Sequence, residues 1–279
     1  MLLQERGDWG YKGADKRERM NPNESHIIGM ASQKAGVGKT IISVNLSVAL
    51  KKMGYNVLLV DSDTENPSVG TYLGMGRVNI GYRDVMYGKA ELEQATSVHE
   101  ATGISVLPGA INSKPFTPAP ERVHAVGLAI MASKYDFVIF DTAPGFTINL
   151  TKFYGTAMIV TTPEMPAVTS CIRLAADYDN AGIPHNLIVN RIKNRRYEIS
   201  RQELEQIYEK KIMADIIEEE IVPLSISEHI PAYIIDPNTG FYKSITKIAK
   251  ACSAEVVAMD QSTKKTGVLD SFKSKLGLH

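Results

Sequence analysis

The stretch that decides the fold is Ser32-Gln33-Lys34-Ala35-Gly36-Val37-Gly38-Lys39-Thr40. It follows an apolar run over residues 27–31 and opens a patterned stretch over residues 41–53. A buried strand, a glycine-bearing turn and a helix, in this order, are the context in which Gly-x-Gly-Lys-Thr forms a phosphate-binding loop. A Gly-x-Gly-Lys-Thr turn without that role is the alternative, and the flanking strand and helix patterns disfavour it.

The backbone of this turn predicts how a polyphosphate is held. Gly36 and Gly38 let the N–H groups curl toward an anion, and the helix that begins near Lys39 adds its positive dipole end. We expect the Lys39 amine to reach the β- and γ-phosphates and the Thr40 hydroxyl to bind Mg²⁺. The predicted nucleotide-binding residues of the loop are Gly36, Val37, Gly38, Lys39, Thr40 and Ile41.

A second lysine, Lys34, lies inside the turn. The stretch resembles the deviant Walker A motif, Lys-Gly-Gly-x-Gly-Lys-Thr, of the MinD/ParA family of nucleoside triphosphatases. In that family the additional lysine reaches the partner's nucleotide, so the resemblance implies ATP, ADP, Mg²⁺ and a sandwich homodimer, with Lys34 and Lys39 both catalytic. Ala35 replaces a usual Gly, and Ile41 replaces a Thr that often touches the α-phosphate. Neither departure removes a catalytic group.

Acidic residues follow the apolar strand predicted over residues 57–60, in the order Asp61-Ser62-Asp63. The carboxyl ends of parallel strands are where open α/β sheets bind ligands, although solvated turns also use Asp. The segment resembles the switch I of the family. This resemblance implies that Asp63 orients the attacking water and that Asp61 supports the Mg²⁺ shell.

A second unbroken apolar strand, residues 137–140, also ends at an acid, Asp141. A carboxylate at such a position is often only a helix N-cap. With Pro144-Gly145 after it, however, the segment resembles the Walker B and switch II of the family. The resemblance implies that Asp141 holds Mg²⁺ through water and that the Gly145 N–H senses the γ-phosphate.

A strand predicted over residues 187–189 ends at Asn190-Arg191, which resembles the adenine-recognising position of the family. The Asn190 amide offers a donor and an acceptor to a base edge, although a lone Asn after a strand is usually part of a turn. The family places Ile-Pro-Glu-Asp beside the adenine, whereas this chain has Ile217-Glu218-Glu219-Glu220. We therefore expect Asn190, Arg191 and Glu218 at the base.

Strand and helix patterns alternate through the chain, which predicts a three-layer α/β/α fold with a mostly parallel sheet and helices on both faces. The resemblance covers roughly residues 26–258, and residues 81–110 are similar to the MinD branch in particular. We predict a mobile extension at 1–24, one P-loop ATPase domain at 25–259, and a linker with an amphipathic helix at 260–279.

The amino-acid composition limits the classes of partner and cofactor that we expect. Thirty-one Lys and Arg balance thirty-one Asp and Glu, so no strongly polyanionic partner is indicated, and DNA would need a local patch such as the basic cluster Arg191, Lys193, Arg195 and Arg196. Two cysteines, Cys171 and Cys252, are far apart, which disfavours an iron–sulfur or zinc protein and a nitrogenase-reductase-like electron carrier. No apolar run reaches transmembrane length and no signal peptide is evident, so we expect a cytoplasmic protein.

The C-terminal stretch carries an amphipathic pattern. On a helix its apolar residues share one face with lysines at the flanks, and these are Val268, Leu269, Phe272, Leu276, Lys273 and Lys275. Such a helix can dock on the protein itself. Its position also resembles the membrane-targeting tail of the MinD branch, which implies peripheral attachment to an anionic membrane at the inner face of the cell membrane.

The sequence therefore predicts a MinD-like Mg²⁺-ATPase that dimerises on ATP, attaches reversibly to a membrane and positions partner proteins, at a cell division site or in another positioned machinery. An activating or cargo protein is implied without being identified. One alternative is a ParA-like ATPase that binds DNA non-specifically for chromosome, plasmid or cargo partitioning. Another is a nucleotide-gated scaffold with little hydrolysis.

Overall fold

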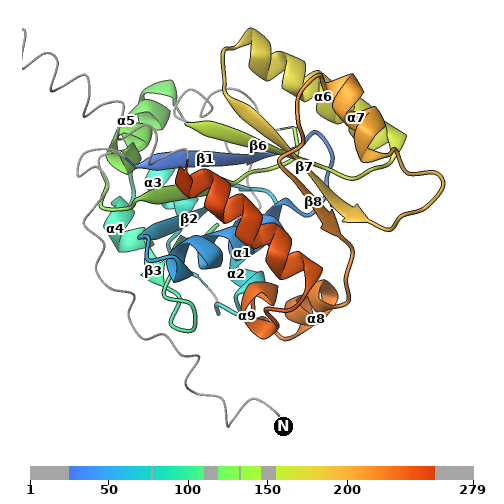
Figure 1. Ribbon diagram of the computed structural model, residues 1–279. Helices are drawn as coiled ribbons and strands as arrows, with labels where there is room; N and C mark the ends of the chain where they lie inside the picture. Colours follow the sequence, from blue (N-terminus) through green and yellow to red (C-terminus); the bar gives the residue numbers. More distant parts are fainter. Residues whose placement is uncertain (1–24, 77, 110–118, 132, 146–154, 255–279) are drawn as a thin grey trace, which may run out of the picture.

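A computed structural model of the chain describes residues 25–76, 78–109, 119–131, 133–145 and 155–254. Its described strands form one sheet in the order β3-β4-β2-β5-β1-β6-β7-β8 (Figure 1). Every neighbouring pair is parallel except β3 and β4, which pair antiparallel at one edge. The strands are β1 His26–Ala31, β2 Val57–Asp61, β3 Ser97–Val98, β4 Ser105–Leu107, β5 Phe137–Asp141, β6 Thr156–Thr161, β7 His185–Ile192 and β8 Ala214–Ile217.

The central strands are apolar except for acids and threonines at their ends, because helices cover both faces of the sheet. All residues of β2, β5 and β6 are buried. The described helices are α1 Lys39–Lys52, α2 Val69–Tyr72, α3 Tyr82–Met86, α4 Leu92–Ala95, α5 Pro120–Met131, α6 Met165–Asn180, α7 Arg201–Tyr208, α8 Ile221–Ser227, α9 Ala232–Ile235 and a helix over residues 240–254.

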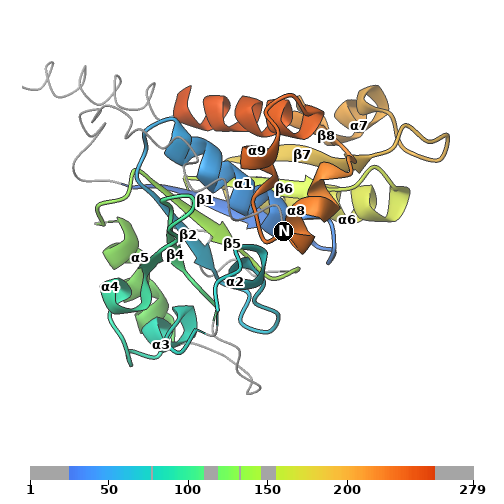
Figure 2. The same cartoon turned by 90° about the horizontal axis from the view of Figure 1, so that it is seen from below.

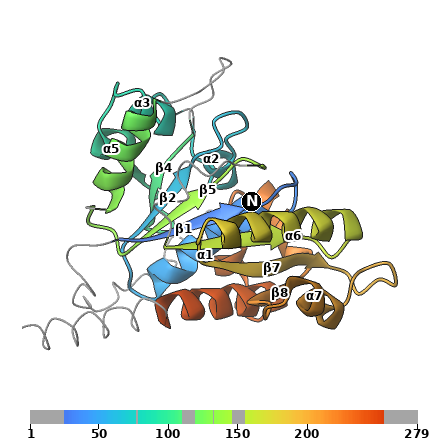
Figure 3. The ribbon, with the colours of Figure 1, turned by 90° about the horizontal axis from the view of Figure 1, so that it is seen from above.

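Two apolar cores lie on the two faces of the sheet. One joins the sheet to α1, α2, α9 and the helix over 240–254, which runs beside α1 in Figure 1. The other joins it to the group α3, α4 and α5 (Figure 2), and to α6, which lies against β6, and α7 (Figure 3). The predicted three-layer α/β/α fold with a mostly parallel sheet is therefore confirmed.

The strand predicted to end before Asn190 is longer than expected, because β7 continues to Ile192. The pairing with β8 shifts between Val189 and Ile192, and Arg191 adopts a φ of 59°. This irregularity lets β7 resume pairing with β8 after Asn190. The placement of Asn190 after the end of a strand was therefore wrong, since the residue lies within β7.

Several predicted segments lie outside the described residues, among them the extension at 1–24 and the amphipathic stretch with Val268, Phe272 and Lys275. Over the described part of the chain, none of the helices combines the length and the apolar character needed to cross a membrane. The functional residues considered next lie where β1, β2 and β5 end, at a single edge of the sheet, and along β7 and β8.

Candidate functional site

The loop between β1 and α1 has the conformation that its glycines permit. Gly36 has a φ of 74° and Gly38 a φ of 97°, a region that favours glycine, and Ala35 is not among the residues with positive φ. A Cβ atom on Gly38 would lie only 2.2 Å from Nδ2 of Asn190. Gly38 is therefore required both by its backbone angle and by the close approach of β7.

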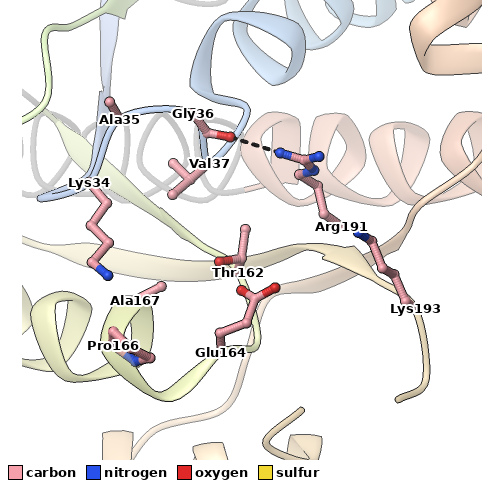
Figure 4. A pocket seen from close by; sticks show the side chains of 10 residues that line it. All are labelled: Lys34, Ala35, Gly36, Val37, Thr162, Glu164, Pro166, Ala167, Arg191 and Lys193. Atoms are coloured by element: carbon pink, nitrogen blue, oxygen red, sulfur yellow. Dashed lines mark hydrogen bonds between the residues drawn. The ribbon is translucent and has the colours of Figure 1, made fainter. Parts of the chain in front are cut away.

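The two lysines of the loop differ in exposure. Lys39 is 7% exposed and its Nζ donates a hydrogen bond to Oγ of Ser32 over 2.8 Å. Burial lowers the pKa of Lys39, while the charges of Asp141 and Asp63 act in the opposite direction. Lys34 is exposed, and Figure 4 shows its side chain extending away from the loop toward the start of α6.

Asp141 at the end of β5 is bound from α1 on both of its oxygens. The Thr40 hydroxyl donates to Oδ2 over 2.6 Å, and the Ser43 hydroxyl donates to Oδ1 over 3.0 Å. Burial raises the pKa of Asp141 to about 6, against the lowering effect of these hydroxyls and of Lys39. The carboxylate is thus held directly beside the threonine that follows the phosphate-loop lysine.

These groups suit Mg²⁺. The described residues hold no cluster of three His, Cys, Asp or Glu side chains that would bind a metal unaided. Mg²⁺ usually binds through one or two carboxylates together with substrate phosphates and water, so the oxygen donors of Thr40 and Asp141 match its preference. Oδ1 of Asp61, across from Asp141 in the sheet, is buried and has no hydrogen-bond partner in the part of the chain that the structure describes.

Asp61 and Asp63 have partners of their own within the chain. Oδ2 of Asp61 accepts from the backbone N–H groups of Ser68 at 2.9 Å and Val69 at 3.0 Å. Burial, helped by the charge of Asp141, raises the pKa of Asp61 to about 8. Asp63 is partly exposed, and its Oδ1 accepts from the backbone N–H groups of Glu65 at 3.2 Å and Asn66 at 2.9 Å. Among the described residues, no backbone N–H donates to its second oxygen.

A cavity of about 520 Å³ is lined by Gly36, Gly38 and the residues predicted at the base. Nδ2 of Asn190 donates to the Val37 carbonyl over 2.8 Å. Arg191 donates to the Gly36 carbonyl over 3.2 Å and to Oε1 of Glu218 over 3.0 Å. The cavity wall also includes Ile41, Tyr72, Ile217, Glu219, Glu220, Val222, Pro223, Ile226 and Phe241.

A smaller cavity of about 360 Å³ lies on the Lys34 side of the loop (Figure 4). Thr162, Glu164 and the first turn of α6 form one wall, and Arg191 and Lys193 form another. The predicted residues come from separate stretches of the sequence, and the structure places them in the phosphate loop, at or just after the ends of β2 and β5, and in the walls of the two cavities: Lys34, Lys39, Thr40, Asp61, Asp63, Asp141, Asn190, Arg191 and Glu218. The predicted Val268, Leu269, Phe272, Lys273, Lys275 and Leu276 lie outside the described residues.

Some residues of the site were not predicted. Ser43 binds Asp141, and its spacing of three from Thr40 puts both on one helix face, a signal that could have found it. Ser32 contacts Lys39 through its hydroxyl and accepts the Gly145 N–H at 2.8 Å through its carbonyl. The Gly145 N–H, predicted to sense a γ-phosphate, is thus bound to the phosphate loop here. Tyr72 in the cavity wall gave no sequence signal.

The sequence of this chain matches a protein-family model and several known proteins. Residues 25–171 match the AAA domain family. The chain is 27% identical over 259 residues to an uncharacterized ATP-binding protein of Methanocaldococcus jannaschii, covering 88% of this chain and 96% of that protein. It is 26% identical over 262 residues to the septum site-determining protein MinD of Thermotoga maritima, covering 89% and 96%.

Among solved structures, the fold superimposes on MinD of Pyrococcus horikoshii in complex with Mg-ADP. The TM-score is 0.75 and the identity 29%, over 81% of this chain and 95% of that one.

Proposed function

Because this chain belongs to the MinD/ParA family of ATPases, we propose that it is a Mg²⁺-dependent ATPase whose ATP-bound form dimerises, attaches reversibly to a membrane and positions partner proteins. The observation that carries the proposal is the contrast between its two loop lysines. Lys39 is buried within its own loop, whereas Lys34 is exposed and extends away from it. An exposed lysine in that position is free to reach a second subunit's nucleotide.

The phosphate side supports hydrolysis. Lys39 would hold the β- and γ-phosphates by charge-assisted hydrogen bonds, and Thr40 and Asp141 would hold Mg²⁺. The bound ion neutralises charge that develops on the phosphate oxygens. Asp63 has one oxygen bound to backbone amides and the other without a backbone donor among the described residues, so this second oxygen would accept a hydrogen bond from the attacking water.

The base side supports adenine. Nδ2 of Asn190 is committed to the Val37 carbonyl, which leaves its Oδ1 as the acceptor offered to the cavity. An acceptor there matches the exocyclic amine of adenine and opposes the carbonyl that guanine has at the same position. The apolar wall, including Ile41, Ile217 and Phe241, suits a flat base.

Membrane attachment is proposed for the C-terminal stretch. Full burial of its four apolar side chains would contribute roughly 1.5–3 kcal/mol each, of which insertion at headgroup depth achieves only part. Folding about ten residues costs roughly 1 kcal/mol each, so one tail binds marginally. Two tails on one dimer raise the avidity by roughly 10² to 10⁴, because the second insertion is intramolecular. ATP would then control attachment through dimerisation.

Co-sedimentation with anionic liposomes tests the proposal. We expect the full chain to sediment with ATP and Mg²⁺ and to stay in solution with ADP. Phe272→Glu, or truncation after Asp260, should abolish sedimentation without altering the ATP dimer. Ser274→Glu is the matched control, since it adds the same charge about 200° around the helix, and it should sediment nearly as the wild type does. Equal binding with ATP and ADP would refute the switch.

Sedimentation with duplex DNA in the same assay distinguishes the ParA-like alternative from membrane attachment. Of the basic cluster, Arg191 and Lys193 form ion pairs with Glu218, at 3.0 Å each, whereas the exposed Arg195 and Arg196 form no ion pair among the described residues. This leaves two arginines for phosphate contacts. Salt-sensitive DNA sedimentation that Arg195→Glu abolishes would favour DNA over membrane. Absence of phosphate release under all these conditions would favour the scaffold.

A further inference from the structure

The helix α2 connects the strand ends that carry Asp61 and Asp141, here called the acidic edge, to the cavity of about 520 Å³. At its first residues, Oδ2 of Asp61 accepts the N–H groups of Ser68 and Val69. The hydroxyl of Ser68 also lies 3.0 Å from the Thr40 hydroxyl, the group proposed to bind Mg²⁺. The start of α2 is therefore bound on two sides to the phosphate half of the site.

The end of α2 faces the other half. Tyr72, the last residue of the helix, lies in the wall of the 520 Å³ cavity with Ile41 and Asn190. The carbonyl of Thr71 accepts from Nδ1 of His229 over 2.7 Å, which fixes α2 to the segment after α8. One short helix thus connects the acidic edge to the proposed base site.

Asp61 itself has no room to move. It is fully buried, and the backbone of Gly109, just after β4, closes the space behind it. A Cβ atom on Gly109 would lie 2.4 Å from Cβ of Pro67 and 3.1 Å from Cγ of Asp61. The carboxylate is enclosed between β4, β5 and the loop that ends at Ser68, so its observed contacts are enforced by packing.

We propose that Asp61 is a positioning residue, which anchors the loop over residues 62–68 and α2, and not a group on which Mg²⁺ binding depends. Because Asp61 anchors it, the segment from Asp63 to Tyr72 is held in place at the edge of the sheet. This segment carries the proposed water-orienting carboxylate of Asp63 at one end and Tyr72, part of the cavity wall, at the other. The roles of Asp63 at the water and of Tyr72 at the base rest on the proposed function, whereas the anchoring by Asp61 does not.

Hydrogen exchange measured on the full chain, without metal and without nucleotide, tests the anchoring. Asp61→Ala removes the acceptor of the Ser68 and Val69 amides, so we expect these amides to exchange at least about ten-fold faster. Asp61→Asn keeps an acceptor oxygen and should stay close to the wild type. Gly109→Ala retains every hydrogen-bonding group but intrudes on Pro67, and it should also speed exchange at these amides.

Asp63→Ala is the matched control, because Asp63 also accepts two backbone amides in the same loop. It should speed exchange at residues 65 and 66 and leave Ser68 and Val69 protected. Unchanged exchange at Ser68 and Val69 in both Asp61→Ala and Gly109→Ala would overturn the anchoring role.

The Mg²⁺ dependence of nucleotide binding provides the second readout. The Mg²⁺ concentration for half-maximal binding should shift by less than about three-fold in Asp61→Asn and by at least about ten-fold in Asp141→Asn. Equal large shifts in both variants would show that Asp61 serves the metal and would refute the proposal. A wild type that lacks hydrolysis, combined with the expected exchange pattern, would refute only the proposed function.

Discussion

The proposed phosphate half of the site, which contains Lys39 and Asp141, and the proposed base half, which contains Asn190, Arg191 and Glu218, are held in different ways. In the phosphate half, Lys39 and Asp141 are 7% and 1% exposed, and both are hydrogen bonded within the protein. In the base half, the side chains of Arg191 and Glu218 are 50% and 35% exposed around an open cavity. A buried ionised group depends on its partners, whereas an exposed ion pair contributes little.

This difference in burial predicts which substitutions should have large effects. Lys39, Asp61 and Asp141 have been removed from water, so the loss of a partner leaves a buried group unsatisfied. Ion pairs in the base half remain hydrated and screened by salt, so their loss is largely replaced by water. We therefore expect the effects of substitutions to decrease from the acids at the ends of β2 and β5 toward Glu218.

The largest effect should come from Asp63→Ala. Loss of the carboxylate that orients the attacking water should lower ATP turnover by about 10² to 10⁴, the usual scale for such a group. ATP affinity should stay unchanged, which separates this result from a binding defect. Steady-state phosphate release and equilibrium binding measure the two quantities. Glu65→Ala, an exposed acid in the same loop, should turn over normally, and equal turnover of both variants would remove Asp63 from the mechanism.

The next effect should be on affinity. Lys39→Ala removes a buried cation opposite the phosphates, and we expect ATP to bind the monomer about 10²-fold more weakly, since hydrogen bonds to charged groups contribute about 1.5–3 kcal/mol. Lys34→Ala, a matched change in the same loop, should alter monomer affinity by less than about three-fold because Lys34 extends away from it. Titration with a fluorescent ATP analogue at low protein concentration measures both, and similar losses would contradict the proposed division of roles.

The phosphate half should also be sensitive to pH. The folded protein raises the pKa of Asp141 from 3.8 to about 6, so between these values it binds more protons than the unfolded chain. Without metal, the contribution of Asp141 to the free energy of unfolding should therefore fall as pH rises from about 4 to 6. Mg²⁺ binds the ionised carboxylate, so it should oppose this loss and bind more tightly above pH 6.

Thermal denaturation of the wild type and Asp141→Asn at pH 4.5 and 6.5 measures this contribution. The Tm of the wild type, relative to that of Asp141→Asn, should be lower at pH 6.5 when metal is absent. Addition of Mg²⁺ should recover part of the difference in the wild type alone. A Tm difference that is the same at both pH values would contradict the assigned burial effect.

The smallest effect is expected in the base half. Glu218→Ala removes the ion pairs with Arg191 and Lys193, but these groups are hydrated, and we expect ATP affinity to change by less than about three-fold. Asn190→Ala should weaken binding more, by roughly five- to ten-fold, because its amide is buried and bound to Val37. A larger effect for Glu218 than for Asn190, measured by the same titration, would reverse the gradient.

Local sequence was enough to predict the fold and to select the residues of the proposed phosphate half. Residues 32–40 contain the whole loop, and the acids come at the ends of apolar runs. A short sequence motif therefore predicted the loop and each acidic segment. The base half was harder because Asn190 and Glu218 come from separate strands, and the irregularity at Arg191 depends on the pairing of β7 with β8. Tyr72 and the enclosure of Asp61 by Gly109 arise only from tertiary packing, which no local pattern reports.

The central claim, that ATP brings two copies together through Lys34, is tested most directly by light scattering after size exclusion, with hydrolysis blocked by Asp63→Ala. With ATP and Mg²⁺, this variant should elute at twice the 30.6 kDa of one chain, and with ADP it should elute as the monomer. The double variant Lys34→Ala, Asp63→Ala should stay monomeric with ATP while still binding it. A dimer in the double variant, or a monomer of Asp63→Ala at saturating ATP, would contradict the account.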